Sequence, residues 1–233
     1  MTAARELVLA RFPDARAAWL AGSVVHGTAT PTSDLDVTVL LDGAPAPFRE
    51  SLVHQGWPVE LFVHHAASVE HWLGMDRTRR RPTLARLIAT GVTLLDVDGA
   101  AGPVAATCDA FLAAGPEPLA DAERDALRYR LTDQLDDLAG DPAPPLRTAV
   151  VMELFAQASL LLLAGQGHWW GSGKWLVREL EAYDDAAGTC FTSRLHGGML
   201  AAIHGEPSEL VDVVEEILDA QGGRLFEGYR VSG

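Results

Sequence analysis

Residues 34–41 alternate between polar and apolar side chains, with Leu40 as the one exception, and this pattern constrains the fold more than any other stretch of the chain. One face would carry Leu35, Val37, Val39 and Leu41, and the other would carry Asp34, Asp36 and Thr38. A period of two is typical of a β-strand with one face in a hydrophobic core. We therefore expect a sheet in which one strand carries two carboxylates on the same side.

Similar patterns predict the other elements of the first hundred residues. Strands are expected over 17–21, 57–64 and 93–97, and helices over 3–12, 24–29, 48–55, 68–75 and 82–90. Within 57–64, Val59, Leu61 and Val63 share one face, and Glu60 lies opposite to them. A third carboxylate is therefore expected on the polar face of a strand.

The second half of the chain carries no convincing strand pattern. Apolar residues recur at helical spacing over 127–138, 146–164 and 210–218. Glycine and proline cluster between 99 and 118, where the halves separate. We expect the α+β class, with a domain over residues 1–100 that has a small mixed β-sheet flanked by helices. An all-helical bundle domain is expected over residues 101–233.

The composition argues against several classes of function. The chain has 32 acidic and 18 basic residues, a formal net charge of −14, whereas nucleic-acid binders usually present a basic patch. Cys108 and Cys190 match no disulfide framework and no zinc motif. The N-terminus lacks the apolar region of a signal peptide, and the apolar stretch 150–164 looks too short and too polar for a membrane span. We expect a cytoplasmic protein without a nucleic-acid or membrane partner.

The carboxylate pair at Asp34 and Asp36 indicates a metal site. Two residues apart on a strand, the carboxylates would lie a few ångströms from each other. Like charges that close repel unless a cation lies between them, and Mg²⁺ is the usual choice beside phosphates. With Glu60 from a neighbouring strand, three carboxylates could hold two metal ions about 4 Å apart, an arrangement that supports phosphoryl transfer.

A Gly22-Ser23 turn follows the strand predicted over 17–21 and precedes the helix predicted over 24–29. Free backbone N–H groups and a hydroxyl at a helix start suit a phosphate group. In the alternative interpretation this is an ordinary turn, and the acidic residues only keep an edge strand soluble. That alternative leaves the polar face shared by the carboxylates unexplained.

These motifs together resemble the signature of the DNA-polymerase-β-like nucleotidyltransferase superfamily. The pattern is Gly22-Ser23, then Asp34-Leu35-Asp36 after ten intervening residues, then Val59-Glu60-Leu61. The longer strings over 21–29 and 32–36 are similar to bacterial branches of that superfamily. Those branches include the aminoglycoside nucleotidyltransferases and the minimal nucleotidyltransferases of toxin–antitoxin pairs. The resemblance covers about the first 65 residues.

The resemblance implies a role for each motif residue. The implied residues for binding the co-substrate NTP are Gly22, Ser23 and Ser33, and the implied ligands for two Mg²⁺ ions are Asp34, Asp36 and Glu60. Glu60 or another residue would take the proton of the acceptor hydroxyl. His26 stands where many relatives carry arginine, so the charged contact to the nucleotide is in question at that position.

The helical half contributes one further site residue. Relatives of the aminoglycoside type have a helical C-terminal domain that closes over the site, so residues 101–233 are expected to bind the acceptor and act as a lid. The glycine- and tryptophan-rich segment 168–175 brings Lys174 near a helix start, where its ammonium could meet a triphosphate. Lys174 could equally be a surface residue beside tryptophans that pack the bundle.

These features predict an enzyme that transfers a nucleoside monophosphate, AMP in most relatives, to a hydroxyl of a small molecule and releases pyrophosphate. Cationic, aminoglycoside-like acceptors suit the acidic composition, and antibiotic resistance would follow from their modification. The alternative is a regulatory module of the same fold that modifies or masks a partner protein. The acceptor, the preferred base and the oligomeric state stay open.

Overall fold

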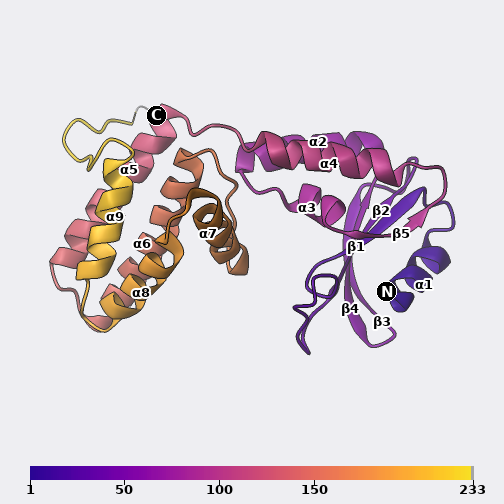
Figure 1. Cartoon of the computed structure of the whole chain (residues 1–233), viewed down its shortest axis with the longest axis horizontal. Helices are drawn as coiled ribbons and strands as arrows, with labels where there is room; N and C mark the ends of the chain where they lie inside the picture. Colours follow the sequence, from indigo (N-terminus) through magenta and orange to yellow (C-terminus); the bar gives the residue numbers. More distant parts are fainter. Residues whose placement is uncertain (232–233) are drawn as a thin grey trace. The chain divides into compact units, whose positions relative to one another are not determined.

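The computed structural model describes residues 1–231, and the chain divides into two compact units, Met1–Gly115 and Pro116–Gly233. The first unit combines a five-stranded sheet with helices, and the second unit is built from helices (Figure 1). The predicted α+β class, with a mixed sheet followed by a helical part, is confirmed.

The first unit has nine elements within the described residues. They are α1 (Thr2–Arg11), β1 (Ala17–Ala21), β2 (Leu35–Leu40), β3 (Phe48–His54), β4 (Trp57–His64), α2 (Ala66–Arg79), α3 (Thr83–Ala89), β5 (Val92–Asp96) and α4 (Ala101–Ala114). The strand order in the sheet is β3-β4-β2-β1-β5. Strands β2 and β4 are parallel, and the other neighbours are antiparallel. The sheet is therefore mixed, and the carboxylate-bearing strands β2 and β4 are adjacent.

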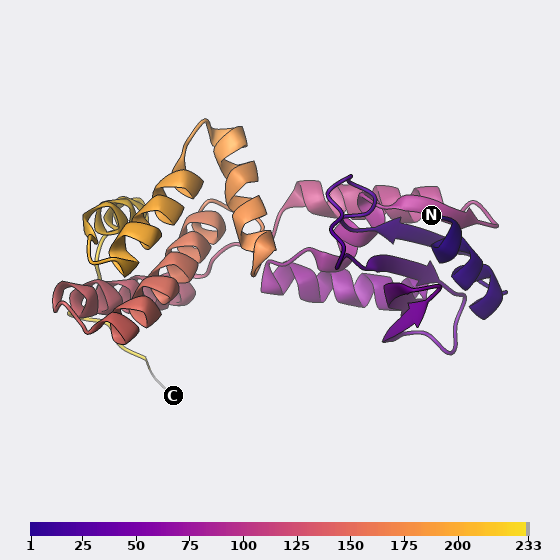
Figure 2. The ribbon, with the colours of Figure 1, turned by 90° about the horizontal axis from the view of Figure 1, so that it is seen from below.

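Helices cover both faces of this sheet (Figure 1). On one face, α1 contributes Leu7 and Val8 to a core with the strand residues Leu20, Val37 and Leu61. On the other face, α2, α3 and α4 pack over β1 and β2, with the buried residues Trp19, Leu40, Leu73, Ile88 and Cys108. Figure 2 shows α2 and α4 extending along the sheet. The face predicted to be polar is therefore largely covered by helices, and Thr38 on it is only 1% exposed.

The helix expected over 48–55 is wrong, because these residues form the edge strand β3. Strand β3 pairs with β4 in an antiparallel hairpin, and its side chains alternate between half-buried and exposed. The hairpin turns at Gln55 and Gly56, which both have positive φ angles, 50° and 81°. Positive φ at both central residues is what a tight two-residue hairpin needs. Pairing with β4 thus determines the conformation of this segment, and the spacing of its own apolar residues does not.

The short helix expected over 24–29 is also wrong. Residues 23–27 form turns, held by hydrogen bonds from Val25 N to Gly22 O (3.2 Å) and from Thr28 N to Ser23 O (3.1 Å). Gly22 and Gly27 have φ angles of 84° and 71°, which are outside the helical region. Only four residues lie between these glycines, which is too few to propagate a helix.

The second unit is a bundle of five helices within the described residues. They are α5 (Asp121–Ala139), α6 (Pro144–Gly165), α7 (Lys174–Ala187), α8 (Phe191–Ile203) and α9 (Ser208–Asp219). Helix α6 is central, since it contacts each of the other four. By length and composition alone, α6 could cross a membrane, which the sequence interpretation had excluded. Its Leu154, Ala158 and Leu161 are fully buried in the bundle core, as in a core helix of a globular unit.

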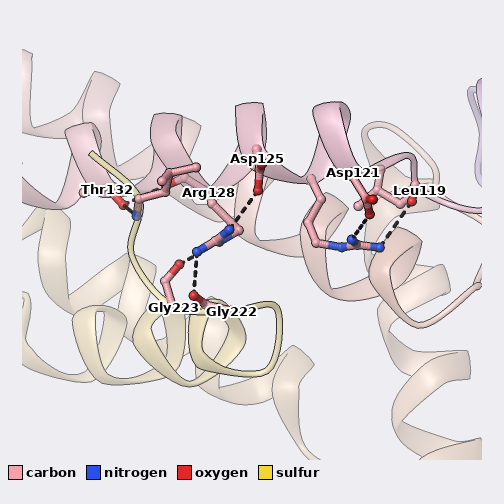
Figure 3. A network of polar contacts seen from close by, with 9 residues as sticks. Leu119, Asp121, Asp125, Arg128, Thr132, Gly222 and Gly223 are labelled. Atoms are coloured by element: carbon pink, nitrogen blue, oxygen red, sulfur yellow. Dashed lines mark hydrogen bonds and ion pairs between the residues drawn. The ribbon is translucent and has the colours of Figure 1, made fainter. Parts of the chain in front are cut away.

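Hydrogen bonds hold the C-terminal segment after α9 against α5 (Figure 3). Arg128 donates hydrogen bonds to the carbonyl oxygens of Gly223 (2.8 Å) and Gly222. The backbone N–H of Leu225 donates to Thr132 Oγ1 at 3.0 Å. Further along, Tyr129 stacks on Tyr229 with ring centroids 4.3 Å apart. Side chains of one helix therefore order the chain well beyond the last helix.

Candidate active site

Three carboxylates converge at one end of the paired strands β2 and β4. Asp36 and Glu60 are direct neighbours in the parallel register, and Asp34 directly precedes β2. One carboxylate oxygen from each of Asp34, Asp36 and Glu60 lies within 4.8 Å of the other two. All three residues are half-buried, so the oxygens stay accessible to a ligand.

The opposite face of the same strands fixes this arrangement. Leu35, Val37, Val59 and Leu61 are all between 0% and 2% exposed, and they anchor β2 and β4 in the core that α1 covers. A slip of one residue would exchange the two faces and bury the acids. The hydrophobic pattern that predicted the strands therefore also sets the convergence of the carboxylates.

A glycine allows the loop after β1 to approach the carboxylates closely. Ala21, the last residue of β1, pairs with Asp36, and Gly22 follows with a φ of 84°. A Cβ atom added at Gly22 would collide with Asp36 Oδ2. This position therefore needs glycine for two reasons, its backbone conformation and the space that the carboxylate occupies.

Two hydroxyl groups meet beside this loop. Ser23 Oγ donates to Ser33 Oγ at 2.8 Å, and Ser33 Oγ also accepts from the backbone N–H of Thr30 at 2.8 Å. Because Gly22 adjoins Ser23 and Ser33 adjoins Asp34, the two predicted phosphate-loop residues and the metal-ligand segment form one continuous site. The structure thus brings together Gly22, Ser23, Ser33, Asp34, Asp36 and Glu60.

His26 and Lys174 are two further residues that the sequence analysis considered for nucleotide binding. His26 is exposed, and its Nε2 lies 3.4 Å from Thr90 Oγ1 just after α3. Lys174 is the first residue of α7 in the second unit, after Gly173 with a φ of 55°. The expected helix start at Lys174 is present, and its role toward a nucleotide stays a prediction.

Arg49 is a residue of the site that the sequence did not reveal. It lies on β3, opposite Phe62 of β4, and its Nη2 donates to Glu60 Oε2 at 2.6 Å. Its guanidinium carbon lies 4.9 Å from the centre of the Phe62 ring. The helix expected over 48–55 concealed this pairing, whereas a hairpin turn at Gln55-Gly56 would have placed Arg49 near Glu60.

The donor set fits a divalent cation. Three carboxylates with oxygens this close repel one another, and a hard cation with oxygen ligands removes that repulsion. The lack of a side chain at Gly22 leaves room for Oδ2 of Asp36, one of these ligands. Asp34, Asp36 and Glu60 are therefore the residues that would hold such an ion.

Comparison with known proteins connects this site to a family. Residues 2–67 match the family model of the nucleotidyltransferase domain, a segment that runs from α1 through β4 and contains all three carboxylates. The nucleotidyltransferase-like protein from Exiguobacterium sibiricum 255-15 is similar in structure, with a TM-score of 0.44 and 11% identity, over 95% of this chain and 76% of that chain. No curated protein matches the chain. The match to the nucleotidyltransferase domain thus lies within the first unit.

Proposed function

We propose that the protein transfers a nucleoside monophosphate from an NTP, with ATP the first candidate, to a hydroxyl of a small molecule. The observation that carries this proposal is the convergence of Asp34, Asp36 and Glu60 beside the Gly22-Ser23 loop, inside the matched domain. The acceptor oxygen forms a bond to the α-phosphorus, the bond from that phosphorus to the bridging oxygen breaks, and pyrophosphate leaves. One or two Mg²⁺ ions held by the three carboxylates would neutralise the phosphate charge.

The strand order suggests how the two substrates divide the site. The phosphate loop follows β1, the pair Asp34 and Asp36 belongs to β2, and Glu60 belongs to β4 on the far side of β2 from the loop. We assign the triphosphate to the Gly22-Ser23 side, with Ser33 as a further contact. The acceptor hydroxyl is assigned to the β4 side, where Glu60 takes its proton. Holding both reactants in one geometry supplies much of the catalysis in this class of reaction.

The acceptor proposal rests on charge. The second unit has twenty acidic and nine basic residues, a net charge of −11, whereas the first unit has twelve acidic and nine basic residues, a net charge of −3. An acidic helical unit favours a cationic acceptor, such as an aminoglycoside-like antibiotic, over a polynucleotide. Within this proposal the helical unit binds the acceptor, Lys174 contacts the triphosphate, and the enzyme works in the cytoplasm.

The test is calorimetric titration of ATP, GTP, CTP and UTP in the presence of Mg²⁺. The variant Asp34→Asn/Asp36→Asn keeps the size of both side chains and removes two negative charges from the site. The variant Asp133→Asn/Asp137→Asn removes the same two charges from the exposed surface of α5 and serves as the matched control. Binding of at least one NTP should be lost in the first variant and kept in the control.

A first variant that binds NTP and Mg²⁺ like the wild type would refute the proposed site. The NTP selected by this titration is then used in an acceptor screen with release of pyrophosphate as the readout. Transfer of label to a protein in place of a small molecule would favour the regulatory alternative.

A further inference from the structure

A cavity of about 460 Å³ lies in the first unit between the β3–β4 hairpin and the helices α2 and α3, and its lining does not include the three clustered carboxylates. Phe62 lines it and is two residues from Glu60 on β4, so the cavity lies on the same face of the sheet as the carboxylates. Its volume is within the range of small-molecule sites, about 300–1,000 Å³. The nucleotidyl-transfer proposal assigns no ligand to this space.

Two guanidinium groups line the cavity, and each lies over an aromatic ring that also lines it. The guanidinium carbon of Arg49 is 4.9 Å from the Phe62 ring centre, and that of Arg79 is 5.9 Å from the Trp72 ring centre. A guanidinium over a ring keeps its N–H donors available at its edge, where they match a carboxylate or a phosphate. Arg49 uses Nη2 for Glu60, and a guanidinium has five N–H donors in total.

The acidic side chain in the cavity wall is already engaged. Asp76 is 6% exposed, and its Oδ2 accepts the backbone N–H of Leu84 in the first turn of α3 at 2.9 Å. Burial also raises the pKa of Asp76 to about 6. Asp76 uses Oδ2 within the wall, so Arg49 and Arg79 are the side chains there that can donate charged hydrogen bonds to a ligand.

Flat and apolar groups form most of the remaining wall. Phe48, Phe62, Trp72 and Leu87 line the cavity, and Trp72 is 38% exposed. An aromatic ring in a ligand gains contact area and ring stacking from such walls. A simple inorganic anion would leave these surfaces unused.

We propose that this cavity binds a small aromatic molecule that bears an anionic group, a carboxylate or a phosphate, held by Arg79 and Arg49. The inference does not depend on the nucleotidyl-transfer proposal, since it rests on the guanidinium groups, rings and volume of a cavity that Arg49 lines and the three carboxylates do not.

The first experiment is calorimetric titration of the full chain with benzoate, phenyl phosphate and benzylamine, without divalent cations. Benzoate and phenyl phosphate share a ring and differ in the anion, so the tighter of the two identifies the anionic group. Benzylamine has the same ring with a positive charge and should bind at least tenfold more weakly. Absence of saturable binding of both anions to the folded protein would overturn the proposal.

Variants locate the bound anion. Arg79→Gln should lower the affinity for the anion at least tenfold, whereas Arg11→Gln should leave that affinity unchanged. Arg11 is a matched control because its guanidinium carbon also lies 5.9 Å from a ring centre, that of Phe12, and it does not line the cavity. Ser23→Ala tests the phosphate loop, and a loss of binding in that variant but not in Arg79→Gln would place the anion at the loop and refute the cavity site.

A charge insertion gives a second measurement that does not remove an arginine. Thr83 is exposed, lines the cavity and is the first residue of α3, where a glutamate is favourable for a helix. Thr83→Glu should lower the affinity for the anion at least fivefold. Ser208→Glu, at the exposed first residue of α9, should leave this affinity unchanged. Equal affinities in these two variants would contradict the proposal.

Discussion

Arg49 donates a 2.6 Å hydrogen bond to Glu60 Oε2, so a positively charged side chain of the edge strand β3 already contacts one of the three clustered carboxylates. The side chain of Glu60 is 28% exposed, and that of Arg49 is 61% exposed. The pair is thus accessible to solvent and can exchange partners at low cost. A divalent cation that binds Glu60 competes with, and is repelled by, this guanidinium.

Replacement of Arg49 should therefore tighten metal binding. Arg49→Gln is expected to raise the affinity for Mg²⁺ about three- to tenfold in the absence of nucleotide, because a positive charge near the ion is removed. Calorimetry with Mg²⁺, or Mn²⁺ titration followed by electron paramagnetic resonance, measures this. Arg11→Gln removes an equivalent exposed ion pair and should leave the affinity unchanged. A weaker affinity in Arg49→Gln would show that the guanidinium supports the site.

A second prediction concerns the close approach of Gly22 to Asp36. Gly22→Ala should abolish NTP binding and destabilise the fold by about 2–4 kcal/mol, because it adds backbone strain and a collision with the carboxylate. Gly56→Ala has almost the same φ, 81°, but nothing lies within 4 Å of its added Cβ. It should cost only about 1 kcal/mol, from backbone strain alone. Urea unfolding and NTP titration of both variants measure the difference, and equal losses would contradict it.

A third prediction concerns two buried groups with opposite pKa shifts. Burial raises the pKa of Asp76 from 3.8 to about 6, so its contribution to stability is present below pH 4 and is lost as the pH rises through 6. Burial lowers the pKa of His64 from 6.5 to about 4, so its contribution is present above pH 6.5 and is lost as the pH falls through 4. Between pH 4 and 6 the two effects oppose each other.

Asp76→Asn removes the titrating carboxyl group and keeps an oxygen that can accept the N–H of Leu84. Its free energy of unfolding should fall by up to about 3 kcal/mol more than that of the wild type between pH 6.5 and 4. His64→Gln should show the reverse trend. Urea unfolding at several pH values measures both slopes, and parallel curves for wild type and Asp76→Asn would refute the opposing pair.

The sequence predicts the strands of the site because each of them buries one apolar face. Val37 and Leu61 are fully buried, and the alternation around them fixes where Asp36 and Glu60 lie. The edge strand β3 lacks such a signal, since its side chains are half-buried at most and its conformation depends on pairing with β4. Arg49 and the cavity therefore became visible only in three dimensions.

The polar face of β2 and β4 illustrates a second limit. A period of two separates the faces but does not say what covers each one. Thr38 lies on the face of Asp36 and is almost fully buried under helices, whereas Asp36 itself is half-buried. Helix placement decides which polar residues of one face reach a ligand, and the spacing of residues along a strand carries no information about it.

A fourth prediction concerns the chain after α9. Arg128 and Arg124 lie one turn apart on α5, and each pairs with an aspartate three residues earlier, Asp125 at 2.8 Å and Asp121 at 2.6 Å (Figure 3). Arg128 also donates to the carbonyl oxygens of Gly222 and Gly223. Its side chain is 15% exposed, against 31% for Arg124, so its hydrogen bonds are better shielded from water.

Arg128→Gln should release the segment after α9, while Arg124→Gln should not, although both variants lose an equivalent ion pair. The expected loss for Arg128→Gln is about 2 kcal/mol in the unfolding of the helical unit, because two carbonyl oxygens lose a charged donor. Hydrogen exchange at the amide of Leu225, which donates to Thr132 Oγ1, reports release of the segment directly. Exchange at that amide should accelerate at least tenfold in Arg128→Gln alone. Equal acceleration in both variants would show that the i,i+3 ion pairs, and not the bonds to Gly222 and Gly223, hold this segment on α5.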